Sequence, residues 1–212
     1  MKNKSTIHEM IQNAKRVAVI PSKIAGVDAF CAAVGLYSML KKTGKGVNFI
    51  YQGKVPDEVV KIIPDDEITR NIKERNLQIR VDYSMTNAGK VHYSTDEDVL
   101  TLLLGPIPND FDHEKMVSTS LVGFDFDLIF TVGLQSVQDL GQTYRVLENK
   151  FDNAQIINID NLSTNEKFGV KNVIDVNSSS LSVLVFKLAS KWGLEPDISA
   201  ANAILKGISL IK

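Results

Sequence analysis

A chain of 212 residues is long enough for one well-filled α/β domain, and 44% hydrophobic with 23% charged residues is ordinary for a globular protein. The formal net charge of -1 excludes a strong overall attraction to nucleic acid or anionic lipid. Residues 1–54 are basic and residues 55–130 acidic, so the early segment is either an anion-attracting patch or a solvated face balanced by the acidic one.

Four features of the first third of the chain predict alternating strands and helices. Residues 16–20 read as a buried strand, residues 27–42 as a helix of small and apolar side chains, and residues 47–51 as a second strand. Residues 56–76 are charged and helical in tendency, and Pro64 divides them into two short pieces.

The middle of the chain has a different pattern, typical of antiparallel strands. Turn-forming residues occur at 86–89 and at 95–98. The short strands that these turns join are expected at 78–83, 90–93 and 99–104. We therefore predict an antiparallel hairpin, around residues 78–104, inserted between α/β units.

The last third returns to apolar strands separated by amphipathic helices. Strands are predicted at 127–132, 155–159 and 173–175, and helices at 138–151, 178–192 and from the N-cap Asp197 to about Ile211. Strands that are apolar on both faces belong to parallel sheets covered by helices. The fold class is therefore α/β, with a mainly parallel sheet flanked by helices. The loops after Ile20, Val132 and Ile159 should meet at the carboxyl edge of the sheet, where such proteins bind ligands.

Three segments, in order, resemble the motifs of the DHH phosphoesterase family. Residues 156–169 contain Asn-Ile-Asp-Asn-Leu and then Phe-Gly, similar to the family's Asn-Ile-Asp-His-His signature strand and loop. Residues 17–47 resemble the first family motif, and residues 127–133 with 139–141 resemble the second. The resemblance implies one Rossmann-like DHH domain over residues 1–212, with no counterpart of the family's smaller C-terminal substrate domain.

The resemblance also implies a site for two Mn²⁺ or Mg²⁺ ions, which activate a water and neutralise charge on the attacked phosphate. Two metal-ligand positions keep their acid, as Asp28 and Asp160. The positions at which the family's ligands are replaced are Ser22, Gly26, Gly133, Asn161, Leu162 and, at the end of the last helix, about Ile211. Two carboxylates are too few anions for two dications, so we expect no metal cofactor and a degenerate site.

The leading hypothesis is a non-hydrolytic protein that binds a protein partner, a second copy of itself or a phosphorylated small molecule. The loop residues that would touch such a ligand are Ser22, Asn161, Ser163 and Asn165. The alternative is an active Mn²⁺- or Mg²⁺-dependent phosphoesterase with a rearranged site on Asp28 and Asp160, acting on nucleotides, short oligonucleotides or pyrophosphate. Neither reading involves a membrane, and nucleic acid is not expected as a partner because of the net charge.

Simpler structural roles compete with each of these assignments. Asp160 can start an Asx-turn, and Asp28 can favour a helix N-terminus electrostatically. The single Cys31 lies among small residues, which predicts a packed core thiol and excludes an internal disulfide. With no uninterrupted apolar run of ~18 residues and no apolar signal-peptide core, the chain is expected in the cytoplasm.

Overall fold

The computed structural model describes residues 6–74, 76–84, 90–124, 126–141, 144, 145, 148, 151 and 154–210. The chain divides into two compact units. The first combines Met1–Lys73 with Phe124–Lys212, and the second, Glu74–Gly123, is inserted between them. That residues 1–212 make up the single family domain stays a prediction.

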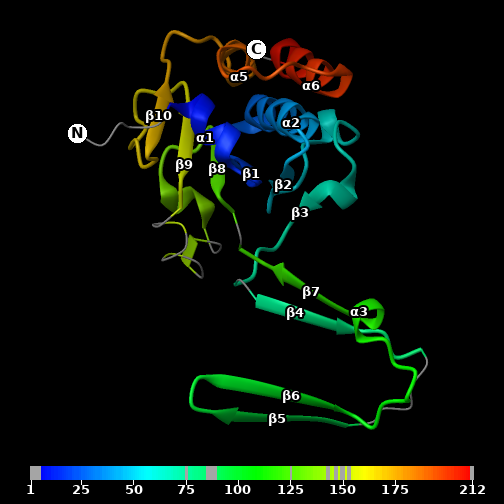
Figure 1. Ribbon diagram of the computed structural model, residues 1–212. Coiled ribbons are helices and arrows are strands. Elements are labelled where there is room, and N and C mark those ends of the chain that lie inside the picture. The colour runs from blue at the N-terminus through cyan, green and yellow to red at the C-terminus, as the bar shows by residue number, and fades with distance from the viewer. Residues whose placement is uncertain are drawn as a thin grey trace. The chain divides into compact units, whose positions relative to one another are not determined.

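The first unit is built on a six-stranded sheet in which every neighbouring pair is parallel. The strands, in spatial order, are β10 (Lys171–Ile174), β9 (Ile156–Asp160), β8 (Leu128–Val132), β1 (Arg16–Pro21), β2 (Gly46–Ile50) and β3 (Ile68–Thr69). This arrangement confirms the predicted parallel α/β sheet (Figure 1).

One face of the sheet is covered by helices that lie together in Figure 1. They are α2 (Gly26–Lys42), α5 (Leu181–Lys191) and α6 (Ile198–Ser209). Because side chains alternate along a strand, Val17 and Val19 of β1 point to this face and join its core. The helices approach closely: a side chain at Gly35 of α2 would lie 2.7 Å from Ile204 of α6. Cys31 is buried in this core, as predicted, and burial raises the pKa of its thiol to about 12.

The other face has a smaller core. Ala18 and Ile20, the alternate residues of β1, pack there with Leu134, Leu140 and Phe151 from the segment after β8. That segment was predicted as a helix over residues 138–151. Its start forms a 3₁₀ helix, Val137–Leu140, and the described residues 144, 145, 148 and 151 are helical, as predicted.

The predicted division of residues 56–76 at Pro64 is found as two 3₁₀ helices, Asp57–Val59 and Asp65–Glu67. Two short elements were not predicted, and the first is β3, directly after the second 3₁₀ helix. A helix that was not predicted, α1 (Ile7–Asn13), begins at a capping box formed by Thr6 and Glu9. None of the described helices combines the length and apolar character that a bilayer crossing needs.

The second unit consists of two antiparallel ribbons and one short helix. The elements are β4 (Asn76–Val81), β5 (Lys90–Asp96), β6 (Val99–Gly105), α3 (His113–Met116) and β7 (Val117–Val122). The β5–β6 hairpin confirms the predicted insertion, but β4 pairs with β7 and not with β5. The turn predicted at residues 86–89 lies outside the described residues.

Candidate functional site

The carboxyl ends of β1, β8 and β9 lie side by side in the sheet, and the loops that follow them are joined by backbone hydrogen bonds. The Ser22 amide donates to the Val132 carbonyl oxygen at 2.8 Å, and the Gly133 amide donates to the Ile159 carbonyl oxygen at 2.8 Å. These three loops therefore form one rim, at the edge where parallel α/β sheets bind ligands. We take this rim as the candidate site.

Asp28, in the first turn of α2, is bound to the start of a different helix. Its two carboxylate oxygens accept the amides of Leu181 (2.6 Å) and Ser182 (3.0 Å), the first residues of α5. Ser180 caps the same helix end, because its hydroxyl oxygen accepts the Val183 amide at 3.0 Å. Asp28 thus supplies both negative charge and acceptors at a helix N-terminus, where amides lack partners within the helix.

Asp160, the last residue of β9, is buried, and its carboxylate is held by the loop that follows it. One oxygen accepts a hydrogen bond from the backbone amide of Asn161, and the other accepts one from the side-chain amide of Asn165, both at 2.8 Å. Asn165 is itself buried and also donates to the Leu134 carbonyl oxygen at 2.8 Å. Its own amide oxygen accepts the side-chain amide of Asn158 at 2.8 Å.

This polar network continues into the sheet. The Thr131 hydroxyl of β8 donates to the Asn158 side-chain oxygen of β9 at 2.9 Å, and both residues are fully buried. Buried polar groups are costly unless they are paired, so a chain of such bonds fixes the loop after β9 in one geometry. Asn165 is the centre of this buried network, and its contact with a ligand stays a prediction.

The two acids lie on opposite faces of the sheet. Along β9, Asp160 alternates with Ile159 and shares the face of Ile156 and Asn158, which is the face away from α2. Asp28, in contrast, belongs to α2. Within the described ranges, no three His, Cys, Asp or Glu side chains come together as a possible metal site.

The remaining predicted contact residues have separate surroundings. Ser22 is buried, and its hydroxyl oxygen accepts the amides of Ile24 and Ala25 at 3.1 Å. The Asn161 side-chain amide donates to the Ser178 carbonyl oxygen at 3.2 Å. Ser163 is exposed. Of the four loop residues expected to contact a ligand, Ser163 is thus the one exposed at the surface.

Gly133, directly after β8, is closely surrounded. Its φ of +73° favours glycine, and an added Cβ would lie 2.9 Å from the Leu181 side chain and 3.1 Å from Ala25 and Ala29. Apolar atoms of α2 and α5 therefore occupy the space beside the end of β8. At Gly26, where φ is +75°, no atom lies within 4 Å of the same position.

A crevice lies at the carboxyl ends of β1 and β2, beside the loop after β8. It is lined by Ile20, Lys23, Ile50, Gln52, Leu134 and Asp139, among others. Its volume is about 20 Å³. That is room for about one water molecule, whereas small-molecule sites usually span about 300–1,000 Å³.

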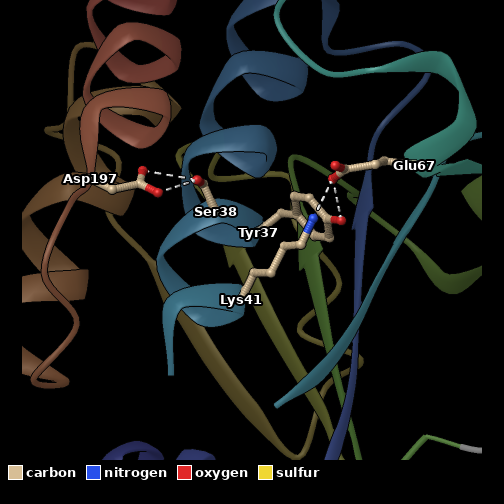
Figure 2. Close-up of polar contacts among 5 residues, drawn as sticks. All are labelled: Tyr37, Ser38, Lys41, Glu67 and Asp197. Atoms are coloured by element: carbon tan, nitrogen blue, oxygen red, sulfur yellow. Dashed lines mark hydrogen bonds and ion pairs between the residues drawn. The ribbon is translucent and has the colours of Figure 1, made fainter. Parts of the chain in front are cut away.

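A larger groove, of about 400 Å³, lies away from this rim, between α2, the 3₁₀ helix at Asp65–Glu67 and the start of α6. Figure 2 shows its polar groups: the Tyr37 hydroxyl donates to Glu67 at 2.6 Å, and the Lys41 ammonium donates to the same carboxylate oxygen at 2.9 Å. The Ser38 hydroxyl donates to Asp197, the N-cap of α6, at 2.9 Å. These polar groups are engaged with one another, as expected of contacts that join the three elements.

The groove predicts a pH dependence of stability. Burial, together with the hydrogen bond to Glu67, raises the pKa of Tyr37 from its ordinary 10.0 to about 12. The folded state therefore favours the neutral phenol, and this contribution is complete below pH 10 and lost as the pH rises from 10 to about 12. We expect Tyr37→Phe to flatten the fall in unfolding free energy over this range, measured by urea denaturation at several pH values. Tyr83→Phe, at an exposed position, is the control and should leave the slope unchanged.

Comparisons with known proteins bear on the fold. No family model matches the chain. Among solved structures, the chain is similar to an exopolyphosphatase-related protein from Bacteroides fragilis, with a TM-score of 0.62 and 15% sequence identity. The match covers 98% of this chain and 51% of that protein, so this chain spans about half of its length. At this identity the likeness establishes the fold.

Proposed function

We propose that this chain is a non-hydrolytic relative of the DHH phosphoesterases that acts by binding, as a scaffold for a protein partner or a phosphorylated ligand. The fold shared with an exopolyphosphatase-related protein supports a phosphoesterase-like frame. The ordered motif matches, from residues 17–47 to residues 156–169, support the relationship to the DHH family.

The observation that carries the proposal is the position of Asp28. Both of its carboxylate oxygens accept backbone amides of α5, at 2.6 and 3.0 Å, so its role is that of a helix cap. Asp160 is likewise engaged, with Asn161 and Asn165. A pair of divalent ions needs several oxygen or imidazole ligands that converge on one place. The engagement of both acids with protein amides supports a binding role over a two-metal centre.

Two features support a binding role. Helix α2 begins at the rim, with Ala25 as its N-cap residue. Among the described residues, no side chain forms a capping hydrogen bond with this helix end. Helix N-termini attract anions, which favours a phosphorylated ligand. The inserted unit exposes many large apolar side chains, which favours a protein partner.

The test measures Mn²⁺ binding and hydrolysis in the wild type, and the free energy of unfolding in a variant of the rim acid Asp28 and in a control variant. We expect calorimetry to show no specific Mn²⁺ binding, and assays with pyrophosphate, a short oligonucleotide and a cyclic dinucleotide to show no Mn²⁺-dependent hydrolysis. Asp28→Asn should instead lower the free energy of unfolding by about 1–3 kcal/mol, because it weakens a charged pair of hydrogen bonds. Asp66→Asn, which removes an exposed acid, should change it by no more than about 0.5 kcal/mol.

Mn²⁺-dependent hydrolysis that is abolished by Asp160→Ala would contradict the proposal and favour the metal-dependent phosphoesterase. Because Asp160 is buried, that variant must first be shown to be folded. The buried Trp192 is the chain's single tryptophan, and its fluorescence reports the first unit.

A further inference from the structure

The inserted unit, residues 74–123, which we call the arm, has no core of its own. Among its described residues, none is buried. Its strands form two separate two-stranded ribbons, β4–β7 and β5–β6. An isolated two-stranded ribbon is marginally stable at best in water, and stable sheets have at least three strands or pack against another layer. The arm therefore lacks a packing layer.

The β5–β6 ribbon has one uncharged, largely apolar face and one face that mixes charged, polar and apolar side chains. Tyr93 pairs with Leu102 in the antiparallel register, and both point to the same side as their neighbours two residues away. The apolar face consists of Val91, Tyr93, Thr95, Leu100, Leu102 and Leu104. The opposite face is polar on β5, with Lys90, His92, Ser94 and Asp96, whereas β6 places Val99, Thr101 and Leu103 on it. Tyr93 is 75% exposed and Leu102 is 50% exposed.

The β4–β7 ribbon repeats this design. Leu77 pairs with Leu121, and Val81 pairs with Val117, on the same face as Ile79. Leu77, Ile79 and Leu121 are exposed. Alternation of apolar and polar residues, which β4 and β5 show, is the pattern of a strand with one covered face. β6 is apolar on both faces. The apolar face of each ribbon therefore has the composition of a covered face, although most of its side chains are exposed.

We propose that the arm is a dimerisation element, in which the apolar faces of the β5–β6 ribbons from two copies of this chain pack together about a two-fold axis. The face carries no charged side chain, so it can meet an identical face without repulsion or desolvation of charge. Two such ribbons form the two layers of a small sandwich, which is the arrangement that covers a one-sided sheet.

The charges of the ribbon select the direction of packing. Its tip is the acidic turn Asp96-Glu97-Asp98, and its base begins at Lys90. Parallel packing would place two acidic tips together, where like charges repel. Antiparallel packing separates the tips and brings each of them toward the end of the partner that carries Lys90.

Within the arm, no described residue is buried, so its own side chains provide no covering layer for the apolar face. A second copy of the chain supplies an identical uncharged face as that layer. Large contiguous patches of exposed apolar side chains are rare on monomeric proteins and mark interaction sites. The inference goes beyond the proposed function and does not depend on it, since a hydrolytic enzyme can dimerise in the same way.

The experiment measures the mass of the full chain in solution by sedimentation equilibrium at micromolar concentrations. The wild type should have about twice its chain mass of 23.4 kDa. Leu102→Glu places a charge in the apolar face and should raise the dimer dissociation constant by at least about 100-fold. Thr101→Glu adds the same charge at the neighbouring exposed residue, on the opposite face, and should leave the dimer intact.

The fluorescence of Trp192 is the folding control. This buried residue lies in the first unit, so its emission spectrum should be the same in both variants as in the wild type. A wild-type chain that stays monomeric over the whole concentration range would overturn the proposal. This outcome is also expected if the two ribbons of one copy cover each other's apolar faces. A dimer that Leu102→Glu leaves unaffected, or that both variants weaken equally, would overturn it as well. Loss of the dimer in Leu102→Glu alone supports it.

Discussion

Gly133→Ala is expected to lower the free energy of unfolding by about 2–5 kcal/mol, whereas Gly26→Ala lowers it by only about 1–2 kcal/mol. Both glycines have a similar positive φ, +73° and +75°, so the backbone strain of an added Cβ is the same. At Gly133 the new carbon would also lie 2.9 Å from Leu181 and 3.1 Å from Ala25 and Ala29. The difference between the variants therefore isolates the tight packing at the end of β8.

Urea denaturation of the two variants measures this difference. Equal losses in both would contradict close packing at the rim. The same geometry bears on metal binding, because Gly133→Asp places an acid where the resemblance to the DHH motifs implies one. We expect Gly133→Asp to be at least as destabilised as Gly133→Ala and to gain no Mn²⁺ affinity, since the space is filled by the side chains of α2 and α5.

Asn165→Ala has the second large expected effect, a loss of about 3–5 kcal/mol of unfolding free energy. The substitution removes the partner of the Asp160 carboxylate, the Asn158 amide and the Leu134 carbonyl oxygen at once. Each group loses this partner in the interior, although the Asp160 carboxylate keeps the backbone amide of Asn161. An unpaired buried polar atom costs about 1–3 kcal/mol, more when it carries charge, and water entering the new cavity offsets part of the loss.

Asn161→Ala is the matched control. This neighbouring asparagine is half-buried, and its side chain makes one hydrogen bond of 3.2 Å, to the Ser178 carbonyl oxygen. Its loss should cost about 1 kcal/mol or less. Unfolding in urea, followed by Trp192 fluorescence, measures both variants. If Asn165→Ala costs no more than Asn161→Ala, the buried network does not stabilise the loop.

The sheet could be predicted from the sequence because its signals are local. Runs such as residues 16–20 and 155–159 are apolar on both faces, which is typical of buried parallel strands, and the helices between them carry their own start and stop residues. Asp197, for example, was predicted as an N-cap, and its carboxylate accepts the Ala200 amide at 2.7 Å.

The contacts of the rim could not be predicted, because they join residues far apart in the sequence. Asp28 is 153 positions from Leu181, and an acid in the first turn of a helix is already explained by that helix. Thr131 and Asn158 lie within apolar strands, where a single polar residue gives no sign of its partner. The one available signal was Asn165, whose residue type suits a loop that must satisfy several buried groups.

The same limit explains the pairing in the arm. The β5–β6 hairpin is closed by a short turn at residues 96–99, which local turn chemistry predicts. β4 instead pairs with β7, a partner some distance along the chain that was not predicted as a strand. The run Ser118-Thr119-Ser120 within Val117–Val122 is equally typical of a loop, so the strand signal is weak on its own.

The arm leaves and rejoins the first unit at one point. The Phe124 amide donates to the Lys73 carbonyl oxygen at 2.9 Å, so the two backbones are hydrogen-bonded neighbours where the insertion begins and ends. Such a junction tolerates inserted sequence of almost any length, because loop closure costs little more as a loop grows. The arm can therefore change in length or sequence, and with it the surface that binds a partner, while the strands of the sheet stay the same.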